Sequence, residues 1–353
     1  MVGTGTGGAG AMTDLSNRFA TARAVAPQQP LLSVRGLGVT FEGGREGLWG
    51  PPHKVPALEN ITFDLDRGRT LGLVGESGSG KSTLGRAILR RLPLSEGRVI
   101  FDGKDISHVK GEALRRLTRD IQLIFQDPYT SLNPRMKVLE LVAEPLLVHG
   151  LVSSLEEARD QVGELLRLVN LPPEALDRFP HGFSGGQRQR IGIARALALR
   201  PRLIIADEPV SALDVSVRAQ VVNLMQDLQQ ELGLTYVFIA HDLSVVRHIS
   251  HEIAILHRGR MVEMAGRDAI YDAPEHPYTR ILLSAVPEPD PALRRNGGNA
   301  PQAHRPPVLN EEGPGCRYRD CCEKAGGHCQ REAPPFARHG GGRWASCWHV
   351  STD

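Results

Sequence analysis

Two short stretches decide the fold of this chain: G-E-S-G-S-G-K-S at Gly75–Ser82 and F-S-G-G-Q at Phe183–Gln187. The first is a complete match to the phosphate-binding pattern G-x-x-x-x-G-K-[ST]. Apolar residues at 71–74 predict a buried strand before it, and its final Lys and Ser open a predicted helix. Glycines let the backbone approach phosphate, and the amides and dipole of a helix start favour an anion. An incidental Gly-rich turn is a weaker explanation, because strand and helix lie where a phosphate loop needs them.

The last two residues of this loop carry the chemistry of a nucleotide site. We expect Lys81 to reach the β- and γ-phosphates of ATP. We expect the hydroxyl of Ser82 to ligate Mg²⁺, a hard cation that prefers oxygen ligands and keeps several waters. The loop therefore predicts a protein that binds ATP together with magnesium.

A second apolar run, Leu203–Ala206, ends in two carboxylates, Asp207 and Glu208. We expect Asp207 to lie near Mg²⁺, through water, and Glu208 to act as the general base that polarises the attacking water. An ordinary strand-to-loop junction could give the same short string. The phosphate loop upstream in the same chain favours the catalytic interpretation.

Two further polar residues follow predicted strands: Gln126 after Ile121–Phe125, and His241 after Tyr236–Ala240. The amide oxygen of Gln126 could contact Mg²⁺ or the attacking water, and His241 could hydrogen-bond the γ-phosphate. Taken alone, Gln126 would be an ordinary strand-end amide, and His241 stands out only by its position. Asp214, shortly after Glu208, could cross a dimer interface or simply start a helix.

The stretch Phe183–Gln187 has no acid–base chemistry of its own. Ser184 and the amides of Gly185 and Gly186 form an anion site at a predicted helix start, and the helix continues through Leu197. Without the phosphate loop, a Gly-rich helix cap would be the default interpretation.

With these motifs in this order, the chain resembles the ATP-binding subunit of an ABC (ATP-binding cassette) transporter over roughly residues 31–290. The resemblance implies an α/β fold, a P-loop NTPase cassette with a RecA-like core, a small antiparallel β subdomain and a helical subdomain. It also implies that two subunits enclose two ATP molecules, each phosphate loop facing Ser184 and Gly186 of the other subunit. Phe41 is placed to stack on adenine, with Trp49 as a rival, and local packing is the alternative for both.

Motifs and resemblance together define the expected site. The residues expected to bind nucleotide are Phe41, Gly75, Glu76, Ser77, Gly78, Ser79, Gly80, Lys81, Ser82, Thr83, Gln126, Ser184, Gly185, Gly186, Gln187 and Asp214. The residues expected to act in catalysis are Glu208, His241, Gln126 and Lys81. The residues expected around Mg²⁺ are Ser82, Gln126 and Asp207.

Several strings resemble one subfamily, the bacterial oligopeptide/dipeptide importer ATPases, whose relatives move nickel complexes, glutathione and some sugars. The insertion near Trp49 and the Phe at 183 resemble one of the two non-identical ATPases of such importers. That implies a heterodimer with a second ATPase, two membrane permeases and an extracytoplasmic binding protein. Gly182 departs from the pattern, since the subfamily often has an acidic residue there. The strings are Asp127–Pro134, Val210–Gln220, His276–Arg280 and Leu282–Pro287.

Composition divides the chain into four predicted parts. Residues 1–30 are rich in Gly, Ala and Thr and are predicted to be disordered. Residues 31–286 form the ATPase domain, with a helical subdomain at about 128–180. Residues 287–314 form a Pro- and Gly-rich linker, and residues 315–353 form a Cys-rich C-terminal extension.

Charge and hydropathy narrow the function classes. The formal net charge is only +2, so nothing predicts a nucleic-acid surface. No apolar run approaches the roughly 20 residues needed to span a bilayer, and the N-terminus lacks a secretory pattern. We therefore expect a peripheral protein on the cytoplasmic face of a membrane, docked on separate permeases.

All five cysteines lie after residue 315. Clustered cysteines in a cytosolic protein favour a metal over disulfides. The spacing C-x5-C-x6-C-x17-C, at Cys316, Cys322, Cys329 and Cys347, resembles the subfamily's C-terminal extension, for which a 4Fe–4S cluster is implied. Four thiolates would suit zinc equally well, and free thiols on a flexible tail are the simplest alternative. Cys321 could replace Cys322 or be idle.

Two other classes compete with the importer interpretation. A soluble cassette protein of translation usually carries two cassettes, and one of DNA repair carries long coiled-coil or zinc insertions; this chain has one set of motifs and no sustained heptads. An ATP-gated regulator with little turnover could dispense with Glu208 and His241, which are both intact.

Overall fold

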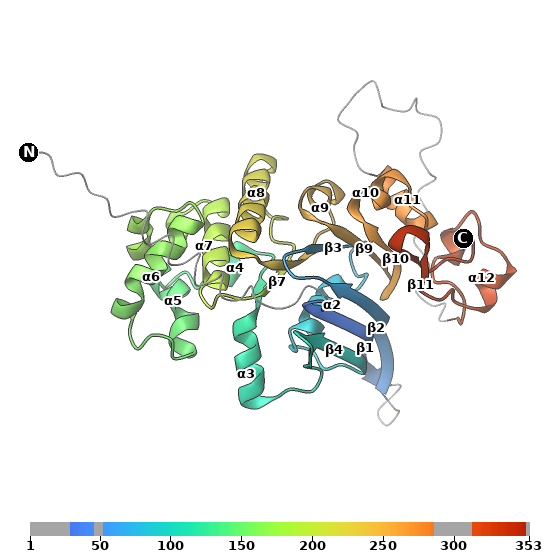
Figure 1. Cartoon of the computed structure of the whole chain (residues 1–353), viewed down its shortest axis with the longest axis horizontal. Helices are drawn as coiled ribbons and strands as arrows, with labels where there is room; N and C mark the ends of the chain where they lie inside the picture. The colour runs from blue at the N-terminus through green and yellow to red at the C-terminus, as the bar shows by residue number, and fades with distance from the viewer. Residues whose placement is uncertain (1–28, 46–51, 286–312, 351–353) are drawn as a thin grey trace, which may run out of the picture.

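The computed structural model describes residues 29–45, 52–285 and 313–350 (Figure 1). Within these residues the strands form two sheets, a smaller one of order β2-β1-β4-β5 and a larger one of order β11-β12-β10-β9-β3-β8-β7-β6. The smaller sheet is antiparallel throughout. Its strands are β1 Leu32–Arg45, β2 Pro52–Leu65, β4 Glu96–Phe101 and β5 Lys104–Asp105.

The larger sheet has a parallel centre and antiparallel additions at one edge. Strands β9, β3, β8, β7 and β6 run parallel, and β10, β12 and β11 join them antiparallel. Strands β3, β7 and β8 are buried along their whole length, as expected for parallel strands that are covered on both faces. The bounds are β3 Thr70–Val74, β6 Ile121–Ile124, β7 Leu203–Asp207, β8 Thr235–Ile239, β9 Glu252–His257, β10 Arg260–Gly266, β11 Ala337–His339 and β12 Arg343–Ala345.

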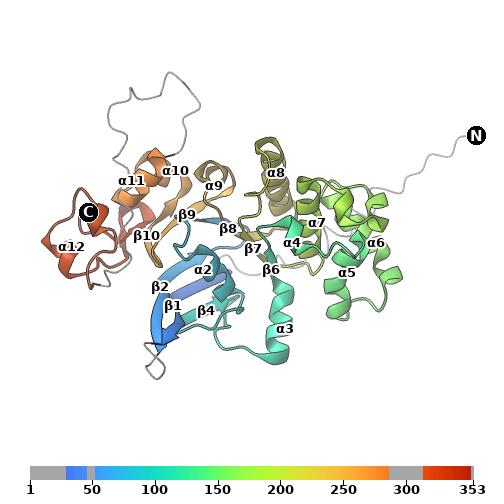
Figure 2. The same cartoon turned by 180° about the vertical axis from the view of Figure 1, so that it is seen from behind.

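Helices cover this sheet and extend beyond it at one end. Figures 1 and 2 show α5 and α6 at the end of the molecule opposite to the C-terminal strands. The α-helices are α2 Lys81–Ile88, α3 Gly111–Asp120, α4 Pro128–Ser131, α5 Val138–Val148, α6 Leu155–Leu168, α7 Gly185–Leu197, α8 Val215–Leu232, α9 Leu243–Ile249, α10 Arg267–Asp272, α11 Pro277–Ser284 and α12 Gly327–Arg331. Short 3-10 turns occur at Pro173–Asp177, Pro180–Gly182, Arg319–Cys321 and Gly340–Gly342.

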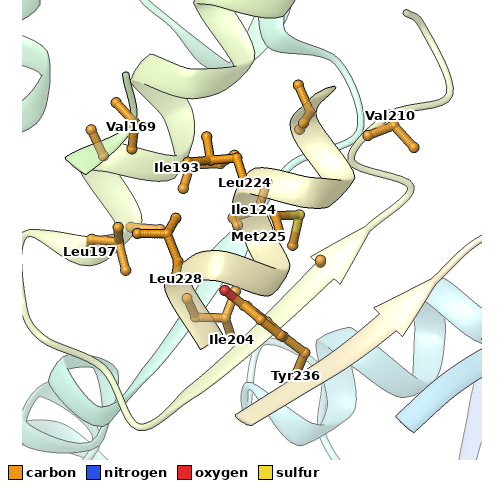
Figure 3. Close-up of a cluster of buried hydrophobic side chains, with 14 of the residues drawn as sticks. Ile124, Val169, Ile193, Leu197, Ile204, Val210, Leu224, Met225, Leu228 and Tyr236 are labelled. Atoms are coloured by element: carbon orange, nitrogen blue, oxygen red, sulfur yellow. The ribbon is translucent and has the colours of Figure 1, made fainter. Parts of the chain in front are cut away.

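The packing of α7 and α8 on the sheet fixes the helix start at Phe183–Gln187. Ile193 of α7 and Leu228 of α8 lie in one buried cluster with Ile204 of β7 (Figure 3). Fully burying a side chain of this size contributes about 1.5–3 kcal/mol. The core thus fixes the position of α7, and hydrogen bonds from Arg188 to the carbonyl oxygens of Pro180 and His181 anchor the loop before it.

The α/β fold expected from the sequence is confirmed, and the predicted strands are found within one or two residues at most ends. The insertion near Trp49 is shorter than the sequence predicts: the turn-rich pattern spans Glu42–Pro56, but β1 continues to Arg45 and β2 begins at Pro52, so this expectation is wrong at both ends. The strands pair across this region, with Phe41 opposite Val55. Trp49 lies outside the described residues.

The division into four parts stays a prediction. Most of the predicted N-terminal tail (1–28) and most of the predicted linker (287–312) lie outside the described residues. Residues 337–345 supply the two edge strands that pair onto β10. Among the described residues, no helix combines the length and the apolar character needed to cross a bilayer.

Candidate functional site

The phosphate loop links β3 to α2 and ends in an uncapped helix start. Gly80 occupies the N-cap position with φ 104°, and no side chain caps the helix. A Cβ at Gly80 would lie 2.7 Å from Leu58 Cδ2 and 3.0 Å from the carbonyl oxygen of Ala57. Both the left-handed backbone and the close approach therefore require glycine at this position. The first amides of α2 stay available to a ligand.

Lys81 is buried at the base of this loop. Its Nζ donates to the carbonyl oxygens of Gly75 and Glu76, at 2.8 Å each. Burial lowers the pKa of Lys81, and the carboxylates of Glu208 and Asp207 oppose that shift. The loop thus holds its cation in place by backbone carbonyls.

Ser82 and Asp207 bring two oxygen donors together. The hydroxyl of Ser82 donates to Asp207 Oδ1 at 2.8 Å. Burial raises the pKa of Asp207, and the hydrogen bond from Ser82 opposes that shift. A hydroxyl beside a carboxylate at the start of a phosphate-binding helix fits the oxygen preference of Mg²⁺.

Gln126, Glu208 and His241 follow the neighbouring strands β6, β7 and β8, and their side chains converge on the carboxylate of Glu208. Its Oε2 accepts from Gln126 Nε2 at 3.0 Å and lies 3.2 Å from His241 Nδ1. Its backbone is left-handed, with φ 49°, and its amide donates to the carbonyl oxygen of Ile239 at 2.9 Å. Such a conformation costs about 1–3 kcal/mol in a residue with a side chain and occurs mostly at functional sites.

These groups surround one cavity of about 870 Å³. Its wall includes much of the phosphate loop and Thr83, together with Gln126 and Glu208. Asp207 bonds to the lining residue Ser82, whereas His241 lies beside Glu208 and lines a neighbouring cavity with Gly75 and Glu76. The structure therefore brings together the expected catalytic and magnesium residues.

The second glycine-rich helix start lies elsewhere. Ser184 caps α7: its hydroxyl accepts from the amide of Gln187 at 3.3 Å, and its own amide donates to Gln187 Oε1 at 3.0 Å. A Cβ at Gly186 would lie 2.2 Å from Val217 Cγ1, so this glycine also lets α7 approach α8. Neither Ser184–Gln187 nor Asp214, at the N-cap of α8, is among the described residues that line the cavity.

The residues on the side of the site expected to hold adenine were predicted less completely from the sequence. Phe41 is 42% exposed and lies opposite Val55 across β1 and β2. Val55, Pro56 and Ala57 line the cavity, whereas Phe41 is not among its lining residues. Val55 could not be identified from the sequence, because its exposure and its position opposite Phe41 depend on the pairing of β1 with β2.

Nothing in the sequence pattern predicted that residues near the C-terminus and in the β9–β10 turn also line this cavity. Gly313, Pro314 and Arg317 line it, as do Arg258 and Gly259 of the β9–β10 turn.

The five cysteines are free thiols. Burial raises the pKa of the Cys316 thiol, and Cys329, Cys347 and Cys322 each add to that shift, so these four sulfurs lie near one another. Within the described chain, however, no three His, Cys, Asp or Glu side chains are grouped as metal ligands. The prediction of a 4Fe–4S cluster or zinc therefore finds no support in the present thiol arrangement.

Two family models match separate parts of the chain. The model for ABC transporters matches residues 58–211, which include the phosphate loop and the first residues after Glu208. The model for the oligopeptide/dipeptide transporter C-terminal region matches residues 262–329, which run from β10 into the Cys-rich part.

Curated relatives match nearly the full length. An oligopeptide transport ATP-binding protein OppF from Salmonella typhimurium is 47% identical over 318 residues, covering 88% of this chain and 93% of the relative. The OppF protein of Streptococcus mutans is 53% identical over 268 residues, covering 76% and 85%. A solved dimeric ATP-binding cassette, MJ0796 bound to ADP and Pi, has a TM-score of 0.58 and 30% identity, covering 67% of this chain and 98% of that one. The chain thus belongs to the ABC transporter family, in its oligopeptide/dipeptide branch, and is an ATP-hydrolysing subunit.

Proposed function

We propose that this chain drives an importer of oligopeptides, with Glu208 as the general base for ATP hydrolysis. The observation that carries the proposal is the position of the Glu208 carboxylate, which Gln126 and His241 hold beside the phosphate loop. A base must lie within hydrogen-bond reach of the water that it activates. The oligopeptide substrate follows from the names of the relatives.

The other residues of the cavity bind and orient the nucleotide. Lys81 and the free amides of α2 hold the phosphates, and Ser82, Asp207 and Gln126 offer oxygens to Mg²⁺. When bound, magnesium neutralises phosphate charge during transfer. His241 keeps the Glu208 side chain directed and hydrogen-bonds the γ-phosphate.

Ser184–Gln187 and Asp214 act on a second subunit. They do not line the chain's own cavity, and two of the similar solved cassettes are dimeric. We propose that each phosphate loop faces the partner's Ser184 and Gly186, and that the partner is a second, non-identical ATPase. Two permeases and an extracytoplasmic binding protein complete the importer, and the chain works on the cytoplasmic face of the membrane without nucleic acid.

The cysteines are a separate proposal. The spacing of Cys316, Cys322, Cys329 and Cys347, which resembles the subfamily's C-terminal extension, is the argument for a metal, 4Fe–4S or zinc. No step of ATP hydrolysis depends on it. Anaerobic purification followed by metal analysis and a visible spectrum tests it, and a folded, colourless, metal-free protein would remove it.

The test of the main proposal uses Glu208→Gln, which keeps the shape and removes the base. We expect turnover to fall by about 10²-fold or more while ATP binding survives. Affinity purification from native membranes with this variant, ATP and Mg²⁺ should recover two permeases and a second ATPase, because the closed dimer accumulates.

Three results would contradict the proposal. Near-normal hydrolysis would overturn the role of Glu208. Recovery of the chain alone, or with ribosomal or repair proteins, would favour a non-transport cassette. A permease set with a binding protein for nickel complexes, glutathione or sugars would replace the oligopeptide assignment.

A further inference from the structure

The C-terminal segment, residues 313–350, forms part of the nucleotide cavity. Gly313, Pro314 and Arg317 line the same cavity as Lys81 and Glu208. The segment is held in place by its strand β12, which pairs antiparallel with β10. A part of the chain that lies outside the nucleotide motifs thus supplies side chains to the nucleotide site.

Arg317 is anchored on the wall of this cavity. Its guanidinium forms an ion pair with Glu59 of β2 and donates to the carbonyl oxygen of Arg258. The backbone amide of Glu59 donates to the carbonyl oxygen of Gly259 at 2.8 Å. The backbone amide of Gly259 in turn donates to the carbonyl oxygen of Ser79, in the phosphate loop, at 2.9 Å. Arg317 is therefore linked to the phosphate loop through two backbone hydrogen bonds.

A second connection reaches the loop through Tyr278 of α11. The hydroxyl of Tyr278 accepts from the amide of Glu76 at 3.2 Å. The ring is buried and packs against Tyr318 of the C-terminal segment, with ring centroids 5.4 Å apart. It also packs against His257, at 4.4 Å. Because Glu76 belongs to the phosphate loop, Tyr278 fixes the orientation of one of the loop's amides.

The chemistry of the wall suits an anionic ligand. Arg258 and Arg317 both line the cavity, and a guanidinium forms strong, directional hydrogen bonds to phosphate oxygens. Neither Arg317 nor Tyr278 has a contact with Glu208 among the interactions described here. Their effect should therefore fall on nucleotide binding and not on the hydrolytic step.

We propose that the C-terminal segment completes the nucleotide site of its own chain, with Arg317 contacting the nucleotide and Tyr278 positioning the phosphate loop. The proposal rests on the assignment of this cavity to ATP under the proposed function. It makes nucleotide affinity depend on a part of the chain that lies outside the phosphate loop and the helix start at Ser184.

The test measures equilibrium binding of a fluorescent ATP analogue to the full chain in EDTA, so that hydrolysis does not contribute. Tyr278→Phe removes only the acceptor for Glu76, and Arg317→Ala removes the guanidinium. Each should weaken binding by about 3- to 10-fold, the usual effect of one lost hydrogen bond. Arg317→Lys keeps the cation and should restore part of the affinity. In the ATPase assay KM should rise while kcat is retained.

Two matched controls separate this role from general damage. Arg343→Ala cuts a different anchor of the same segment, in which Arg343 Nη1 donates to the carbonyl oxygen of Ala273 at 3.0 Å, outside the cavity. Tyr236→Phe removes a buried phenol hydroxyl in the core (Figure 3). Both should bind ATP as the unaltered chain does, and thermal unfolding of every variant is the check that it is folded.

Two outcomes of these binding measurements would contradict the proposal. Unchanged affinity in Tyr278→Phe and Arg317→Ala, or an equal loss in Arg343→Ala, would overturn the proposal. Lys81→Ala serves as the reference for the ATP assignment. If the unaltered chain bound no more nucleotide than Lys81→Ala, the ATP assignment itself would be wrong, which is a different failure.

Discussion

The two glycine-rich helix starts, at α2 and at α7, differ in whether side chains of the same chain cap their first backbone amides. At α2 the N-cap is Gly80 and no side chain caps the helix. At α7 the side chains of Ser184 and Gln187 each accept from the backbone amide of the other. The first amides of any helix lack partners within it. The α2 start therefore offers its first amides to a ligand, whereas the cap at α7 occupies the amides of Ser184 and Gln187 and leaves those of Gly185 and Gly186 to a ligand from outside the chain.

A third helix start adds a titratable cap to this comparison. At α11 the Nδ1 atom of His276 accepts from the amide of Tyr278 at 3.0 Å. Burial, with a smaller effect of His257, lowers the pKa of His276 to about 3. Since Nδ1 can accept only when it carries no proton, this cap needs the neutral ring. The start of α2 thus has no side-chain cap, the start of α7 has a hydroxyl cap, and the start of α11 has an imidazole cap.

The largest expected effect comes from Ser184→Arg. A bulky cation at the α7 start should block the anion site offered to the partner subunit. We expect ATPase turnover of the assembled transporter to fall by about 10²-fold, as when a preorganised donor is lost from an active site. Binding of ATP to the isolated chain should not change, because Ser184 does not line its own cavity. Loss of that binding would show that both starts serve the same nucleotide.

Gly80→Ala tests the uncapped start. The new Cβ meets Leu58 Cδ2 at 2.7 Å, and φ is 104°. We expect ATP affinity to fall about tenfold or more, since strain of this kind costs about 1–3 kcal/mol. Gly78→Ala is the matched control, because φ is also positive but nothing lies within 4 Å of its Cβ. Equal losses in both variants would assign the effect to backbone strain alone.

The imidazole cap predicts a pH dependence. The pKa of His276 in the folded chain is about 3, below the ordinary value of 6.5. Between these two pH values His276 is therefore protonated in the unfolded chain but not in the folded chain. Stability should therefore fall as pH drops from about 6.5, by about 1.4 kcal/mol per pH unit for one such group. Glu263, whose carboxylate accepts from the amide of His276, has a raised pKa through burial and acts in the opposite sense.

His276→Asn isolates this contribution, because Asn is a good N-cap that does not titrate. Urea midpoints of both proteins across this pH range should converge as the pH falls. Parallel curves would mean that the proton on His276 does not control the cap.

The smallest effect is expected for Ser184→Ala. It removes the hydroxyl cap of α7 and should cost about 1 kcal/mol of stability. Ser184→Gly, which keeps a favourable N-cap backbone, should cost only a few tenths of a kcal/mol. Chemical denaturation with a probe on α7 measures both. If the two variants were equally stable, the cap would not be a source of the order at this start.

Motifs that carry their own local pattern were predictable from the sequence. The helix start at Lys81 and the strand ends before Gln126, Glu208 and His241 follow from short apolar runs and the residues after them. Because the carboxyl ends of adjacent parallel strands meet at one sheet edge, their convergence was also predictable. The roles assigned to these residues stay predictions.

The contribution of the C-terminal segment was not predictable. Tyr278 and Glu76 are 202 positions apart, and the pairing that places the segment involves β12, which has three residues. A strand this short shows no periodicity, and its position depends on the exposed edge of β10. The His-Pro-Tyr string around Tyr278 marked the subfamily but gave no sign of a contact with the phosphate loop.

The pairing of β12 with β10 has a consequence for solubility. Strand β10 contains the apolar residues Val262 and Met264, and β12 covers its outer hydrogen-bonding groups. A chain shortened before residue 313 would leave those amides and carbonyls open, and an open strand edge is a template for pairing with other chains. The C-terminal segment therefore also covers this edge of β10.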